Sequence, residues 1–262
     1  MPELPTAIER VIVSVGMQAI QREWLRRVQA EYTSAALTHH LTLWLLQITA
    51  PFELVRMGLA IVDDELAHAE LSQAVYVAAG GSGVAPLQRE RLGLSLRPGE
   101  PLELGVARVG LDTFCLGETV AVRLFARLRQ GCNEPVALTA LDRILKDEVR
   151  HRDFGWTLLE WLLSTPASDA VLALAEAELP QQFERLRASY AYASLGQAAD
   201  AGAAPADAQQ RRWGLMPPSH YAEALVETYE RDYGPRFAEL GIDAERAWTA
   251  RLAIAPAPAN VG

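Results

Sequence analysis

The motif D-E-x-x-H occurs twice in this chain of 262 residues, once at 64–68 and once at 147–151. Both copies lie in segments whose apolar residues recur with the period of an α-helix. The Glu and the His of each copy are three residues apart, so they lie about 60° apart on one helix face and can reach one ion. The two motifs therefore favour a fold in which two helices meet.

Chance is a poor explanation for the two copies. The chain contains 22 Glu, 11 Asp and 5 His residues. Random placement of these residues gives on the order of 0.02 matches to D-E-x-x-H, whereas a lone Glu-x-x-His is expected about 0.4 times. The alternative interpretation, in which solvated helix faces carry accidental Glu and His pairs, is therefore the weaker one.

The remainder of the sequence also has the pattern of helices, and no segment alternates convincingly like a strand. The stretch 80–100 contains five Gly and two Pro, and it is long for a loop in a compact domain. We interpret it as a crossover that joins two helical hairpins, and 200–218 as a further loop. The helices are predicted at about 7–47, 51–79, 101–131, 135–164, 169–196 and 219–240.

Hairpin geometry then places one further Glu beside each motif. Residues at equal distances from the turn of an antiparallel hairpin lie side by side. Reflection of the first motif through the turn at 48–50 leads to Glu31, and reflection of the second through 133–134 leads to Glu118. Glu23 is the alternative to Glu31, but it would lie ~12 Å farther along the same helix and so away from the level of the motif. The residues expected at one level are Glu31, Glu65, His68, Glu118, Glu148 and His151.

This set resembles the ligands of the ferritin-like di-iron carboxylate superfamily, in which two helices each supply a Glu and two others each supply Glu-x-x-His. The resemblance covers about residues 18–164. It implies an all-α fold, a ferritin-like four-helix bundle with a long crossover between helices 2 and 3. About two C-terminal helices over 168–250 would complete a single domain spanning 1–262.

The resemblance also implies a metal centre and its chemistry. The six residues would hold two Fe ions, although the same ligands also serve Mn/Fe and Mn/Mn pairs, and dioxygen would be the co-substrate. Asp64 and Asp147 would accept the ring N–H of the histidine on the opposite helix. The expected pairs are Asp64 with His151 and Asp147 with His68.

From this inventory we predict an oxidoreductase, a non-haem di-iron oxygenase or oxidase acting on a small organic substrate in an apolar pocket. The roughly 95 residues after Thr165 exceed what a minimal bundle needs and would roof that pocket. Small and apolar residues near the proposed ligands would line it. They are Ala35, Ile61, Ala69, Phe114, Cys115, Ala121 and Ile144.

Two other function classes compete with this prediction. An iron-handling or peroxide-detoxifying protein would use the same ligands, but two cysteines cannot build the Cys₄ module that often accompanies peroxidase activity. A metal-free helical scaffold or binding module would leave the motifs without a role. Because we find no reductase motif, an enzyme would need an external electron donor. His39 and His40 are interpreted as core or surface residues rather than ligands.

Composition limits the partners and the compartment. The formal net charge of −9 disfavours nucleic acid, whose binding needs a basic surface. The longest uncharged run, 32–52, includes two His and several hydroxyl residues, so we expect a buried helix rather than a membrane span. Two cysteines without C-x-x-C spacing, and an N-terminus without a basic region, favour a cytoplasmic protein. The long helices also allow a homodimer.

Overall fold

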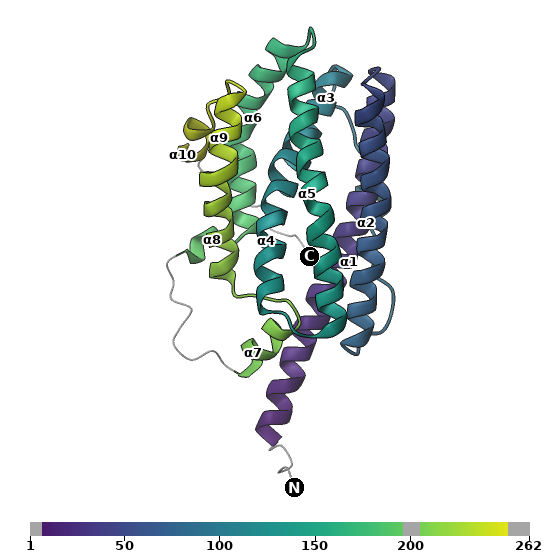
Figure 1. The fold of residues 1–262 in the computed structure, drawn as a ribbon, viewed down its shortest axis with the longest axis vertical. Coiled ribbons are helices and arrows are strands. Elements are labelled where there is room, and N and C mark those ends of the chain that lie inside the picture. The colour runs from purple at the N-terminus through teal and green to yellow at the C-terminus, as the bar shows by residue number, and fades with distance from the viewer. Residues whose placement is uncertain (1–6, 196–204, 251–262) are drawn as a thin grey trace.

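The structure is a computed structural model that describes residues 7–195 and 205–250, with side chains for 16–195 and 208–250. All secondary structure in these ranges is helical, so the predicted all-α class is confirmed for them (Figure 1). Within the same ranges, no helix is both long enough and apolar enough to cross a membrane.

Four long helical stretches pack side by side (Figure 1). The third stretch is continuous but consists of three parts, of which the middle part, η2, is a π-helix that ends at Glu118. The sequence pattern predicted the four stretches but gave no sign of this π-helical part. The parts of the bundle are α1 (Ala7–Gln47), α2 (Phe52–Ala78), α3 (Leu102–Val109), η2 (Gly110–Glu118), α4 (Thr119–Gly131) and α5 (Pro135–Leu163).

The segment 79–101 between α2 and α3 is a crossover that runs along α1. It contains one short 3₁₀ turn, η1 (Arg89–Arg91). Because it returns the chain to the end of the bundle where α2 began, α3 and α4 run in the same direction as α2. His40, which was not expected to bind metal, holds the crossover. The three hydrogen bonds along α1 join Gln21 Nε2 to the Ala79 carbonyl (2.7 Å), Gln29 Nε2 to the Pro86 carbonyl (2.7 Å) and the Leu94 N–H to His40 Nδ1 (2.9 Å).

The C-terminal part covers the side of the bundle formed by α3, η2 and α4 (Figure 1). It contains more helices than the two expected, although α8, η4 and α9 form one continuous stretch that matches the prediction for 219–240. Its elements are α6 (Ser168–Ser189), η3 (Tyr192–Ser194), α7 (Pro205–Arg212), α8 (Pro218–Thr228), the π-helical η4 (Tyr229–Tyr233), α9 (Gly234–Glu239) and α10 (Ala244–Thr249).

Helix α7 corrects the prediction of an uninterrupted loop over 200–218. It packs against α1, and the carbonyl of its last residue, Arg212, accepts the backbone N–H groups of Asn133 and Glu134 at 3.0 Å each. Trp24 Nε1 donates to the Trp213 carbonyl at 3.0 Å just beyond it. These partners lie far away in sequence, which explains why local composition did not predict a helix here.

A layer of buried acidic and histidine residues separates two apolar clusters in the core. On α5, Ile144 belongs to one cluster and Phe154 to the other, with Glu148 and His151 between them. The other bundle helices repeat this order, so each helix carries its polar groups at one level. The bundle therefore places apolar packing on both sides of the layer.

The separation of the third stretch from α5 depends on Gly155. A Cβ at Gly155 would lie 2.6 Å from Phe114 Cβ and 2.8 Å from Cys115 N. The Cys115 thiol donates to the Gly155 carbonyl at 3.3 Å. Since Glu118 ends η2 and His151 lies one turn before Gly155, this contact sets how close those two side chains come.

We expect Gly155→Ala to lower the free energy of unfolding by about 1–3 kcal/mol, because the added methyl group overlaps the backbone of η2. Urea denaturation followed by circular dichroism would measure the change. Gly117→Ala is the matched control, since a Cβ there meets only the Asp112 carbonyl at 3.6 Å. Equal stability of the two variants would contradict the close contact.

Candidate metal centre

The six residues expected at one level come together between the helices of the bundle. Glu31 comes from α1, Glu65 and His68 from α2, Glu118 from the end of η2, and Glu148 and His151 from α5. All six are buried, with at most 9% of any one residue exposed. The helices thus gather four carboxyl groups and two imidazoles in the interior.

Five of these residues form two groups that share one member, whereas Glu148 belongs to neither group. Ligand atoms of Glu31, Glu65 and His68 lie within 4.8 Å of one another, and so do ligand atoms of Glu65, Glu118 and His151. Two ligands on opposite sides of one ion, each ~2.1 Å from it, are ~4.2 Å apart. Both groups therefore have dimensions that suit an ion after small side-chain adjustments.

Glu65 and Glu148 each approach both histidines. His68 Nδ1 is 3.5 Å from Glu65 Oε2 and 4.0 Å from Glu148 Oε1. His151 Nδ1 is 3.6 Å from Glu65 Oε1 and 3.6 Å from Glu148 Oε2. Neither Nδ1 atom has a hydrogen-bond partner, and the same holds for Glu65 Oε2 and Glu148 Oε2.

Leaving such atoms buried and unpartnered costs about 1–3 kcal/mol each. A bound cation would accept the lone pairs of both Nδ1 atoms and of the carboxylate oxygens. The donor set and its orphaned atoms therefore fit a metal site. Ser34 supplies a further contact by donating to Glu65 Oε1 at 2.7 Å.

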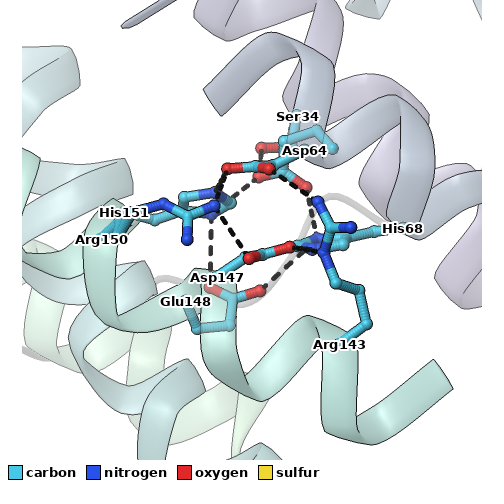
Figure 2. Close-up of polar contacts among 9 residues, drawn as sticks. Ser34, Asp64, His68, Arg143, Asp147, Glu148, Arg150 and His151 are labelled. Carbon is cyan, nitrogen blue, oxygen red and sulfur yellow. Dashed lines mark hydrogen bonds and ion pairs between the residues drawn. The ribbon is translucent and has the colours of Figure 1, made fainter. Parts of the chain in front are cut away.

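The outer nitrogen of each histidine faces an aspartate of the opposite helix. His68 Nε2 lies 3.2 Å from Asp147 Oδ2, and His151 Nε2 lies 3.3 Å from Asp64 Oδ2 (Figure 2). These are the two cross-helix pairs expected from the resemblance. A hydrogen bond from Nε2–H fixes each ring and leaves its Nδ1 lone pair facing the carboxylates.

Two arginines that the sequence analysis missed close this network toward solvent (Figure 2). Arg143 donates to Asp147 Oδ2 and, at 3.2 Å, to Asp64 Oδ1. Arg150 Nη2 donates to Asp64 Oδ2 at 2.7 Å and to Asp147 Oδ1 at 2.8 Å. Their positions one helical turn on either side of Asp147 were the available signal in the sequence.

Burial and neighbouring charges shift the pKa values of the cluster. Burial raises the pKa of Glu31 and Glu118 well above the usual range, and adjacent carboxylates add to the rise. Burial alone would lower the pKa of His151, but its contacts with the carboxylates of Asp64 and Glu148 outweigh this effect and raise that pKa to about 10. The pKa of His68 is raised by similar contacts. Without a cation, the surroundings therefore favour the protonated forms of these groups, and binding of a cation would displace the Nδ1 protons of the histidines.

The aspartates behave in the opposite way. Burial would raise the pKa of Asp64, but hydrogen bonds from His151 and Arg150 outweigh this effect and lower it. The pKa of Asp147 is lowered for the same reason, with Arg143 and His68 as its main partners. Both aspartates therefore remain ionised.

A cavity of about 220 Å³ adjoins the carboxylate cluster. Four acidic residues of the cluster form one end of it. Tyr190, at the end of α6, and Tyr221, in α8, line it from the C-terminal part. The other lining residues are Glu23, Arg26, Arg27, Ala30, Ser34, Ala121, Leu124, Phe125 and Leu128.

Among the seven residues predicted to line a substrate pocket, Ala121 lines this cavity. The other six do not line it, because their side chains fill the core. They are Ile61, Phe114 and Cys115 in one apolar cluster, Ile144 in the other, and the buried Ala35 and Ala69. The residues that do form its walls come from segments whose contacts depend on tertiary structure.

A larger cavity, of about 610 Å³, lies between α4 and the segment around α7 and α8, away from the cluster. Two of its arginines and two of its glutamates pair with one another. Arg127 binds Glu223 at 3.0 Å and Glu227 at 2.9 Å, and Arg123 also contacts Glu227. The chemistry-bearing residues therefore point to the smaller cavity.

Comparison of the chain with protein-family models, curated proteins and solved structures gives no match. The functional argument therefore depends on the geometry of the site.

We expect the metal-free protein to lose stability as the pH rises from 6.5 toward about 10. Groups whose pKa is raised on folding, such as His151, stabilise the fold below their unfolded pKa and lose this contribution as the pH passes their folded pKa. Groups with lowered pKa values, such as Asp64, stabilise the fold throughout this pH range and lose that contribution only at acid pH. Thermal denaturation after removal of metal with a chelator would measure the decline.

The matched variants are His151→Gln, which should flatten this decline, and His220→Gln, which should not because it lies outside the cluster. A metal-free protein whose melting temperature is constant over this pH range would contradict the electrostatic description.

Proposed function

We propose that the protein is a di-metal oxidoreductase, specifically a non-haem di-iron oxygenase or oxidase that uses dioxygen on a small organic substrate. One observation carries the proposal. Two potential ligand groups share Glu65, and both histidines turn an unpartnered Nδ1 atom toward the carboxylates. On a solvated helix face water would bond these nitrogens, and in an ordinary core most buried nitrogens have a protein partner.

The donor types favour iron or manganese. Carboxylate and imidazole ligands suit these metals, whereas Cu(I) and structural Zn favour thiolates. Glu31, Glu65 and His68 would hold one ion, and Glu65, Glu118 and His151 would hold the other. The four carboxylates, once ionised, would balance the charge of two divalent cations.

The arrangement of the helices agrees with the same proposal. Two antiparallel hairpins joined by a long crossover are typical of ferritin-like bundles, whose core sites use this ligand set. We therefore assign the bundle to the ferritin-like class as part of the proposal. Tyr190 and Tyr221 line the cavity beside the cluster, so the C-terminal part contributes to a substrate site.

Two bound redox-active ions would supply the binding of dioxygen and electrons for its reduction. The chain's own residues orient and protect that centre. Asp64 and Asp147 hold the histidine rings, Ser34 orients Glu65, and apolar clusters on both sides exclude bulk water. An external donor would return electrons after each turnover.

Metal content after anaerobic loading with Fe(II) and desalting tests the proposal. We expect about two irons per chain. Glu65→Ala should remove both ions because Glu65 belongs to both groups, whereas Glu31→Ala should remove about one because Glu31 belongs to one. Elemental analysis measures the content. Glu70→Ala, an exposed change on the same helix, is the control and should retain both ions.

Other outcomes would support other classes. Many irons per chain would indicate a storage protein. Absence of bound metal would support a metal-free helical scaffold or binding module. Bound manganese without iron would preserve the site but change its chemistry. With two irons in place, the optical spectrum should change when oxygen is admitted, and a spectrum that never responds to oxygen would contradict an oxygenase or oxidase.

A further inference from the structure

The cavity beside the carboxylates has a cationic end that the proposed metal chemistry does not use. Arg27 lines this end and is buried, with 4% of the residue exposed. Its guanidinium lies 4.3 Å from the centre of the Trp24 ring. A fully charged side chain is thus held in the interior one helical turn before Glu31.

The hydrogen bonds of Arg27 leave one nitrogen free. Its Nε donates to Glu23 Oε1 at 3.2 Å, and its Nη2 donates to the Gly214 carbonyl at 3.0 Å. Its Nη1 is buried and has no hydrogen-bond partner. A buried charged donor without an acceptor is costly, so an anionic acceptor would stabilise Nη1. Because Nη1 has almost no accessible surface, such an acceptor would reach it from the cavity only after a small shift of the side chains around it.

The charges around this position indicate a singly charged ligand. Glu23 also accepts two hydrogen bonds from Arg26, at 2.9 and 2.8 Å. Two guanidinium groups therefore share one carboxylate, which leaves one positive charge in excess at this end. Tyr221 lines the same cavity, and its hydroxyl lies beside the Arg27 guanidinium, which partly offsets the rise that burial causes in the Tyr221 pKa.

The rest of the cavity suits a short apolar body. Ala121, Leu124 and Phe125 give the same cavity an apolar part in addition to the arginine and the four carboxylates. Arg27 and Glu31 are four residues apart on α1, which corresponds to ~6 Å along the helix. The volume of about 220 Å³ lies below the roughly 300–1,000 Å³ usual for ligand pockets, so the ligand is small.

We propose that this cavity binds a small organic monocarboxylate whose carboxylate pairs with Arg27 Nη1 and whose apolar body extends toward the cluster of glutamates. That this ligand is the substrate rests on the function proposed above. Binding of the anion itself depends only on Arg27 and the cavity walls. Arg27 has two alternative roles: it could hold the backbone at Gly214 in place, or it could balance the charge of Glu31. Neither role would make binding depend on the charge of a ligand.

The test compares carboxylates with amides of the same shape. Butyrate, hexanoate and benzoate would be titrated by calorimetry into the Fe(II)-loaded full chain under anaerobic conditions, beside butanamide, hexanamide and benzamide. We expect at least one acid to bind about tenfold more tightly than its amide, as for a charge-assisted hydrogen bond. Elemental analysis of the same samples records the metal content.

Three variants assign the preference to Arg27. Arg27→Met should reduce the ratio of amide to acid dissociation constants to near one, and Arg27→Lys should retain part of it. Arg22→Met is the matched control, since Arg22 is exposed on the same helix, does not line this cavity, and loses the same charge. The ratio within each variant is insensitive to the fraction of unfolded protein.

Equal binding of acids and amides, absence of acid binding at millimolar concentration, or an unchanged ratio in Arg27→Met would overturn the inference. Two irons per chain together with any of these results would leave the proposed function intact. Charge-selective binding by a chain that takes up no metal would support the anion site and contradict the proposed function instead.

Discussion

The burial of four carboxyl groups and two imidazoles at one level is the constraint on which the rest of the structure depends. Removing ionised groups from water is costly unless they are paired, protonated or bound to a cation. Here apolar clusters lie on both sides of the layer, and the raised pKa values of Glu31 and Glu118 reflect the cost of burial. The helices must supply partners for every group in the layer.

The structure meets part of this requirement through a series of contacts that leads from the layer toward the solvent. The histidines face the carboxylates through Nδ1 and the aspartates through Nε2, and Arg143 and Arg150 join the aspartates at the half-exposed edge. Each step moves charge closer to solvent, where it is better screened. The four inner atoms that no protein group satisfies are the ones that a cation would complete.

The cavity extends this chemistry in one direction. Its lining includes the acidic cluster, an apolar part with Ala121, Leu124 and Phe125, and the buried Arg27, whose Nη1 has no hydrogen-bond partner. A ligand held at both ends would have one orientation, because its anion and its apolar body prefer different walls. Positioning of this kind is how a protein selects which atom of a ligand faces a reactive centre.

The sequence by itself determined the helices and much of the layer. Periodicity and turn residues are local signals, so they predicted the four bundle stretches. The spacing of the motifs predicted which six side chains would meet, and the structure brings them together. The Gly and Pro content of 80–100 also predicted the crossover. These features follow from short stretches of chain, so a single sequence is sufficient to read them.

Only the tertiary structure decided what surrounds that layer. The π-helical register that ends at Glu118, the helix α7 within an expected loop, and the position of the cavity all depend on contacts between distant segments. Arg27 illustrates the reason: its partner Gly214 is 187 residues away, so no local pattern marks it as buried. Most of the side chains expected to line a pocket instead fill the core. The interior is close-packed, and which side chains fill it depends on how distant segments pack together, which composition does not show.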